Sequence, residues 1–190
     1  GGGAVKIPEL ARGDLQGAAR KVRFPYSELV FRTTESASGP VHRLENGSGG
    51  LIAKFDARDY SSRNFPLYDD EGQVIASFDL ENRVMRVTPD TELQVRDDFK
   101  LSSKNAQGDP DTARQPIVIL GNSGSGASID APSISIEGSV GGFGALKSSQ
   151  GNIEIAAKST LSTTPDFGIA LHSEQNVVLT KPGKSANDGL

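Results

Sequence analysis

The sequence predicts an all-β protein in which short strands stack into an elongated shaft. Beyond Pro89, apolar residues alternate in pairs at short intervals, and glycine, serine, asparagine or proline separates most of the pairs. Alternation with a period of two is typical of half-buried strands. Aromatic residues make up only 6% of the chain, which leaves little material for a thick core. We therefore expect a thin core and almost no helix in the shaft.

Residues 1–50 are predicted to be an irregular segment that docks onto a neighbouring protein or subunit. Residues 26–33 form its one strand-like patch, and residues 11–21 offer at most one or two helical turns because two glycines interrupt them. The tract at 45–50, Glu-Asn-Gly-Ser-Gly-Gly, indicates a flexible turn or a linker. A boundary is therefore expected near residue 50.

Residues 51–92 are predicted to be a strand-rich transition. Strands are expected at 51–55, 74–78 and 84–87, where β-branched and other apolar residues cluster. Residues 67–68 and 74–75 flank an Asp-Asp-Glu-Gly tract, which favours a tight turn. This arrangement predicts a β-hairpin.

Residues 93–180 are predicted to form the shaft, followed by a tail at 181–190. The alternating pairs expected to face its core are Leu93/Val95, Phe99/Leu101, Ile117/Ile119, Ile129/Ala131, Ile134/Ile136, Ile153/Ile155, Ile169/Leu171 and Val177/Leu179. An antiparallel sandwich would also give short strands, but it commonly has a core of large residues. With one strand and one corner per step, a single chain would leave its apolar face exposed. We therefore expect three chains, as a homotrimer or with similar chains, to form an intertwined β-helix or β-prism.

Two segments carry a resemblance to trimeric β-helical spike and fibre proteins. Residues 128–138 and 151–157 are similar to the successive short strands in the needles of contractile phage tails and type VI secretion tips. This resemblance implies a rigid spike, fibre or filament component.

A second resemblance is to the sarcoglycan family. Residues 70–79, followed by 84–87 and 93–95, are similar to a run of strands in that family, and so is the later segment 128–134. The resemblance covers roughly residues 67–180 and implies the same strand rhythm.

Composition excludes several classes of function. The formal net charge is −4 and the isoelectric point is near 5.2, which argues against a nucleic-acid partner. There is no cysteine, so no disulfide, thiolate metal site or cysteine nucleophile is expected. No apolar run reaches the roughly 18 residues of a membrane span.

We predict no catalytic, cofactor-binding or metal-binding residues. His42 and His172 are far apart and have no ligand spacing. The acidic tracts at 69–71 and 109–111 could present oxygens to Ca²⁺, but they lack the spaced pattern of a calcium loop. Residues 121–126 are expected to be a glycine turn, because the Lys-Ser/Thr of a phosphate loop is missing.

The remaining motifs are short. Residues 12–14 match the integrin-binding tripeptide, which occurs often by chance, and residues 46–48 fit the N-glycosylation pattern in an expected loop. A polysaccharide hydrolase would need two carboxylates across a cleft. The available acids are Asp97, Asp98, Glu137 and Glu154, and no spacing singles out a pair.

The function predicted from these observations is that of a non-catalytic structural protein, a rigid trimeric spike, fibre or filament component that is extracellular, on a cell surface or in a virion. One alternative is a surface-displayed module that binds a glycan or a protein through the corners of the rod. Another is a hydrolase like the tailspikes that cut polysaccharide.

Overall fold

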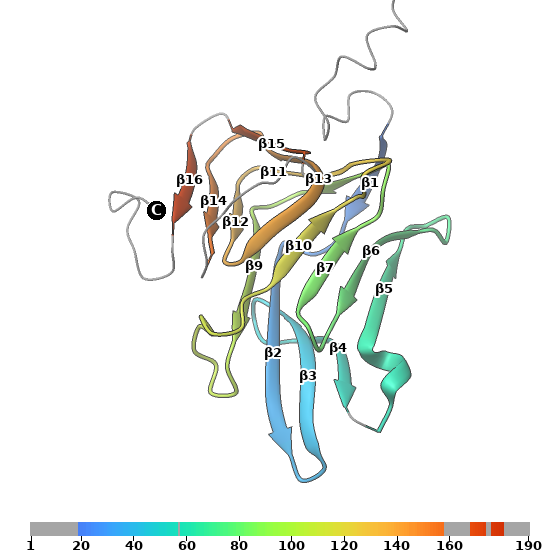
Figure 1. Ribbon diagram of the computed structural model, residues 1–190, viewed down its shortest axis with the longest axis vertical. Helices are drawn as coiled ribbons and strands as arrows, with labels where there is room; N and C mark the ends of the chain where they lie inside the picture. The colour runs from blue at the N-terminus through green and yellow to red at the C-terminus, as the bar shows by residue number, and fades with distance from the viewer. Residues whose placement is uncertain (1–18, 57, 158–167, 174–175, 181–190) are drawn as a thin grey trace, which may run out of the picture.

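The computed structural model describes residues 19–56, 58–157, 168–173 and 176–180, and within them the chain is all-β (Figure 1). One short 3₁₀-helix, η2 (Tyr60–Arg63), and no α-helix occur in this part of the chain. No helix there is long and apolar enough to cross a membrane. The strands are β1 (Arg20–Phe24), β2 (Glu28–Ser36), β3 (Gly39–Asn46), β4 (Leu51–Asp56), β5 (Asn64–Tyr68), β6 (Val74–Asp79), β7 (Val84–Val87), β8 (Thr91–Val95), β9 (Phe99–Lys104), β10 (Ile117–Leu120), β11 (Ala127–Ala131), β12 (Ile134–Ile136), β13 (Ser139–Ser148), β14 (Ile153–Ala156), β15 (Gly168–Ser173) and β16 (Val177–Thr180).

From β7 onward, successive strands are distributed over three parallel stacks. Stack one contains β7, β10 and the first half of β13. Stack two contains β8, β11, the second half of β13 and β15, with β1 added at its other edge. Stack three contains β9, β12, β14 and β16, and β2 joins it beside β9. From β7 to β14 the chain therefore visits stacks one, two and three in turn, and it returns to stack one after β9 and again after β12.

In-register pairing aligns apolar side chains in columns. In stack two, Leu93 pairs with Ile129, which pairs with Leu146. In stack three, Ile136 lies between Leu101 and Ile155. All of these side chains are buried without a second chain. A single chain thus covers the apolar face that the sequence analysis expected three chains to cover.

Glycine allows the chain to turn within the long strand β13. Gly142 and Gly144 have φ values of +94° and +155°, in the region that side chains disfavour. A Cβ atom at Gly144 would lie 1.7 Å from the carbonyl oxygen of Ala127 in the neighbouring strand. The close approach of these backbones lets β13 belong to stack one at its start and to stack two at its end.

Antiparallel strands extend the stacks at one end. Strands β3 and β4 continue from β2, and β6 and β5 continue from β7. The aromatic side chains gather between these two groups: Phe31 and Phe78 have ring centroids 6.3 Å apart, and so have Phe65 and Phe78. The same core continues between the three stacks, where most side chains are aliphatic but Phe24 on β1 and Phe99 on β9 also pack, with ring centroids 6.1 Å apart.

The predictions for the region before residue 93 have mixed outcomes. The strands at 51–55, 74–78 and 84–87 are confirmed, as is the hairpin in which Leu67 pairs with Ala76. The expectation of an irregular segment over 1–50 is wrong for residues 20–46, which form β1, β2 and β3. Polar side chains on the outer faces of these strands obscured the pattern. Residues 45–50 include the end of β3 and the tight turn into β4. The helical turns expected at 11–21 lie mostly outside the described residues.

The strands expected over 93–180 are confirmed where the structure describes them, but some inward residues were assigned wrongly. Val177 on β16 is 42% exposed, and the inward residues of β10 are the other pair. Val118 and Leu120 are buried, whereas Ile117 is 41% exposed and Ile119 is half-buried. Every position of β10 is apolar, so its own sequence does not reveal which face is inside. The pairing of Val118 with buried Met85 on β7 decides it.

Candidate functional site: an arginine-lined pocket

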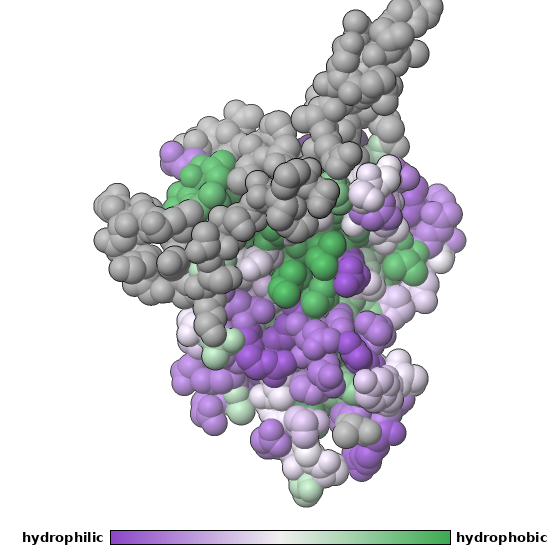
Figure 2. Space-filling model, viewed as in Figure 1, coloured by the Kyte–Doolittle hydropathy of each residue, from purple (hydrophilic) through white to green (hydrophobic). Residues whose placement is uncertain are grey.

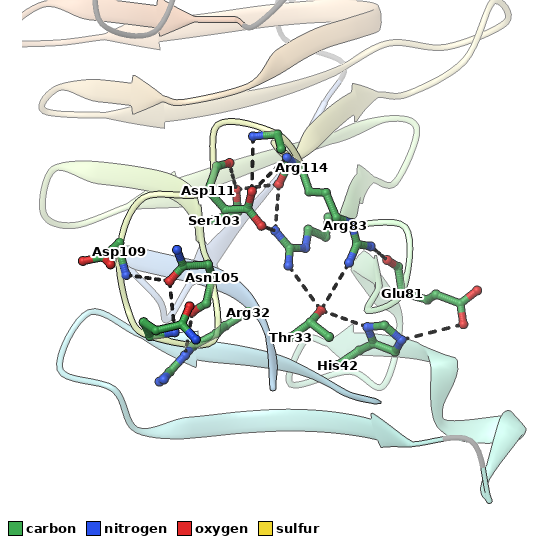
Figure 3. A network of polar contacts seen from close by, with 12 residues as sticks. Arg32, Thr33, His42, Glu81, Arg83, Ser103, Asn105, Asp109, Asp111 and Arg114 are labelled. Carbon is green, nitrogen blue, oxygen red and sulfur yellow. Dashed lines mark hydrogen bonds and ion pairs between the residues drawn. The ribbon is translucent and has the colours of Figure 1, made fainter. Parts of the chain in front are cut away.

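Arg83 lies at the centre of a polar network between the antiparallel strands and the stacks (Figure 3). It ends the turn that follows β6 and has a φ of +59°. The Asp79 carboxylate holds this turn, since it accepts hydrogen bonds from the backbone N–H groups of Glu81 and Asn82. The side chain of Arg83 then enters the protein, and the residue is only 2% exposed.

The Arg83 guanidinium binds acceptors from two separate segments. Its Nη1 donates to the Asp111 carboxylate over 2.9 Å and to the Arg114 carbonyl oxygen over 2.7 Å. Its Nη2 donates to Thr33 Oγ1 on β2 over 3.2 Å. Arg83 therefore fixes the loop between β9 and β10 against the N-terminal strands.

Polar side chains stabilise the turns of the loop between β9 and β10. The Asn105 side-chain oxygen accepts from the N–H groups of Gln107 and Asp109, and Asp111 does the same for Ala113 and Arg114. Such contacts are typical of Asn and Asp at turns. The Ser103 hydroxyl also donates to the Arg114 carbonyl, over 2.7 Å.

Arg114 places a second guanidinium beside the first. Its Nη2 donates to the Glu81 carbonyl oxygen over 2.6 Å, and its Nη1 lies 3.5 Å from Thr33 Oγ1. Thr33 Oγ1 is also 3.0 Å from His42 Nδ1. The two arginines thus converge on one hydroxyl group, as Figure 3 shows.

His42 belongs to this network rather than to a metal site. Its ring stacks on Phe55 with centroids 5.6 Å apart, and Nε2 lies 3.9 Å from the Glu81 carboxylate. Burial lowers the pKa of His42, although the Glu81 charge opposes this effect. His172 lies in β15, in a different sheet, so the two histidines are not brought together. No group of three potential metal ligands occurs among the described residues.

A pocket of about 340 Å³ opens beside the two arginines. It is lined by Asn82, Arg83, Ala113, Arg114, Gln115, Pro116, Ile117 and Ser139. None of these residues is acidic. Burial, and after it the positive charge of Arg114, lowers the pKa of Arg83. Arg83 Nε is the one fully buried side-chain nitrogen or oxygen of the described residues that lacks a hydrogen-bond partner. Because two guanidinium groups and no carboxylate line it, the pocket is suited to an anionic group.

A second polar cluster lies on the outer face of stack two. The Glu92 carboxylate is 2.9 Å from Lys147 Nζ and 3.1 Å from the Ser128 hydroxyl. Burial raises the pKa of Glu92, but the hydrogen bond and charge of Lys147 outweigh it, so the pKa is lowered. The pKa of Asp130 is raised by burial and then by the Glu92 charge. No local sequence pattern predicts that Glu92 and Asp130 lie near each other, because only the register of β8 and β11 makes these two carboxylates neighbours.

The four acids considered for a hydrolase are not gathered at one place. Asp97 and Asp98 lie in the turn between β8 and β9, whereas Glu137 lies between β12 and β13. Glu154 is exposed on β14. Glu154 pairs with Ser135, two residues before Glu137, whereas Asp98 precedes β9 at the opposite end of stack three.

The other tracts serve mainly as turns. The Asp69 carboxylate accepts from the N–H groups of Glu71 and Gln73, and Arg20 also donates to it. Residues 121–126 link β10 and β11, and Asn122 holds this turn through two backbone N–H groups. Residues 46–48 lie in the turn before β4, where the Asn46 side chain accepts from two backbone N–H groups. Residues 12–14 lie outside the described part.

Comparisons with known proteins add no relative. No protein-family model matches the chain, and no curated protein or solved structure matches it.

Proposed function

We propose that the protein is a non-catalytic structural component, a short β-helical rod in a spike, fibre or filament at a cell or virion surface. The observation that carries this proposal is the in-register parallel stacking of successive strands in three stacks. Each added turn extends three ladders of backbone hydrogen bonds and three buried faces together. Such a rod resists bending and unfolding because its strands must separate cooperatively.

The proposed oligomer is still a trimer, but its geometry differs from the intertwined form expected from the sequence. Each chain fills its own core, as the buried column of Leu101, Ile136 and Ile155 indicates. Copies would therefore associate through outer surfaces or rod ends rather than by sharing a core. Strands β15 and β16 are the last strands of stacks two and three within the described residues, and an edge of this kind is able to pair with a further strand.

Light scattering coupled to size exclusion tests the assembly. The trimer predicts three times the chain mass of 20.0 kDa over a wide range of concentrations. A mass of one chain at every concentration would refute the trimer without affecting the single-chain rod.

Hydrogen exchange tests the rod separately. Amides of β8, β11 and β12 should exchange slowly and open as one unit, because they belong to stacked turns. Independent opening of β8 and β11 would contradict the rod. Release of reducing ends from a polysaccharide would contradict the non-catalytic assignment.

The second candidate function, a surface-displayed binding module, is favoured by one observation. The pocket beside Arg83 and Arg114 has two guanidinium groups in its lining and no carboxylate, and of the two only Arg83, with Asp111, has an ion-pair partner in the described part of the chain. Structural and binding roles are compatible, since a rigid rod is also a suitable support for a binding site.

A further inference from the structure

The arginine-lined pocket continues into an exposed apolar strip on β10. Ile117 lines the pocket and is 41% exposed, and Ile119 follows it on the same outer face. In the next strand, Gly141 pairs with Ile119 and has no side chain to cover it. Figure 2 shows an apolar area over β10 directly above a hydrophilic band. We call Ile117 and Ile119 the β10 strip.

The charge near this strip is positive although the whole chain has a net charge of −4. Within the described residues, Arg114 binds only the Glu81 carbonyl and Thr33, and it makes no ion pair. Arg86 on β7 is exposed and pairs with Ile119, so it places another positive charge at the far end of the strip.

Two of the three nearby carboxylates are already engaged by other arginines. Asp111 binds Arg83 over 2.9 Å. Asp79 binds Arg63 over 2.9 Å. The Glu81 side chain is 39% exposed, and its carboxylate lies 3.9 Å from His42 Nε2, beyond hydrogen-bond distance, and makes no ion pair with Arg114. None of these three carboxylates forms an ion pair with Arg114. An incoming carboxylate would supply that partner and would reduce the repulsion between Arg83 and Arg114.

We propose that the pocket and the β10 strip bind an acidic polypeptide segment of another protein. A Glu or Asp side chain enters the pocket and pairs with Arg114, while a neighbouring aliphatic side chain packs on Ile117 and Ile119. Arginine beside exposed aliphatic surface is a typical composition for a protein interface. The lining contains no aromatic ring on which a sugar could stack, which favours a polypeptide over an acidic glycan. This proposal depends on the pocket and not on the rod or its oligomeric state.

Titration of the full chain with a synthetic peptide tests the proposal. The probe is the capped peptide Ser-Glu-Glu-Ile-Val-Ser, and its matched control has glutamine in place of both glutamates. We expect saturable NMR shifts of the Ile117 and Ile119 methyl groups and of the Arg114 side chain with the acidic peptide, and weaker binding as salt is raised. Equal binding of the glutamine peptide, or no saturable shift, would overturn the proposal.

Variants locate the site. Arg114→Gln should weaken binding at least about tenfold, as expected when a charge-assisted hydrogen bond is lost. Arg96→Gln makes the same change in charge at an exposed arginine between β8 and β9, outside the lining, and should alter affinity by less than about twofold. An equal loss in both variants would indicate general charge attraction and would overturn the proposal.

A second variant covers the case in which Arg114→Gln disturbs the loop. Ala113→Trp keeps every charge and places a large side chain at an exposed position of the lining, so it should abolish the shifts without lowering the melting temperature. Unchanged binding to this variant would overturn the pocket as the site. Displacement of the peptide by glucuronate at lower concentration than by free glutamate would assign the pocket to an acidic sugar and would also overturn the proposal.

Discussion

Replacing Ile136 and Ile117 by alanine, one at a time, tests the placement of the core. Both changes remove the same three carbon atoms, and both residues lie on strands of the stacks. Ile136 is fully buried between Leu101 and Ile155, whereas Ile117 is 41% exposed on the outer face. Any difference in stability between the two variants therefore reports on burial.

The expected cost differs severalfold. Loss of three buried carbons in Ile136→Ala removes about 2.4 kcal/mol of transfer free energy, and the unfilled space raises the total to about 3–4 kcal/mol. Ile117→Ala should cost only about 1 kcal/mol, because the side chain is partly exposed and its removal leaves no closed cavity. Urea unfolding followed by circular dichroism measures both values, and Ile136→Ala should also lower the melting temperature by roughly 10 °C. If Ile117→Ala proved as destabilising as Ile136→Ala, the assigned inner face of β10 would be refuted.

Two further predictions concern places where the chain turns. Gly144→Ala should destabilise the protein by more than about 3 kcal/mol, because its Cβ would meet a backbone oxygen at 1.7 Å. Gly72→Ala, at φ +81° with open space around it, should cost only about 1–2 kcal/mol of backbone strain. If both variants lowered the urea midpoint by similar amounts, the close approach at Gly144 would be contradicted. Burial raises the pKa of Asp79, but its bonds with Arg63 and Asn82 outweigh this and lower the pKa from 3.8 to about 2. These bonds should therefore contribute their full stabilisation above about pH 5, and the contribution should be lost as the pH falls from about 4 to about 2. The Asp79→Asn variant should be less stable at pH 7, and its free energy of unfolding should vary less with pH in this range. An unchanged dependence on pH would refute the role of the Asp79 carboxylate.

Much of the fold was accessible from the sequence because its elements are local. The alternation at Ile129/Ala131 and Ile134/Ile136 predicts strands whose inward residues are indeed buried. The local pattern does not predict which strands pair with each other, because stacking requires contacts between residues many positions apart. The same local pattern is compatible with one chain closing its own core or with three chains sharing one.

The candidate site was not predictable in the same way. Thr33, Arg83 and Arg114 come from three separate regions and meet only when the loop before β10 folds against β2. No spacing in the sequence joins them. Arginine is rarely buried unless it is paired, so the sequence offered no reason to expect Arg83 inside the protein.

The sequence by itself determined the strand-rich character and many of the turns, because glycine, β-branched residues and alternation act over a few neighbours. Only the tertiary structure decided which face of β10 is inside, which strands stack, and where the charge of Arg114 is left without a carboxylate partner. These features depend on register between distant strands, and a shift of one residue would exchange the inner and outer faces.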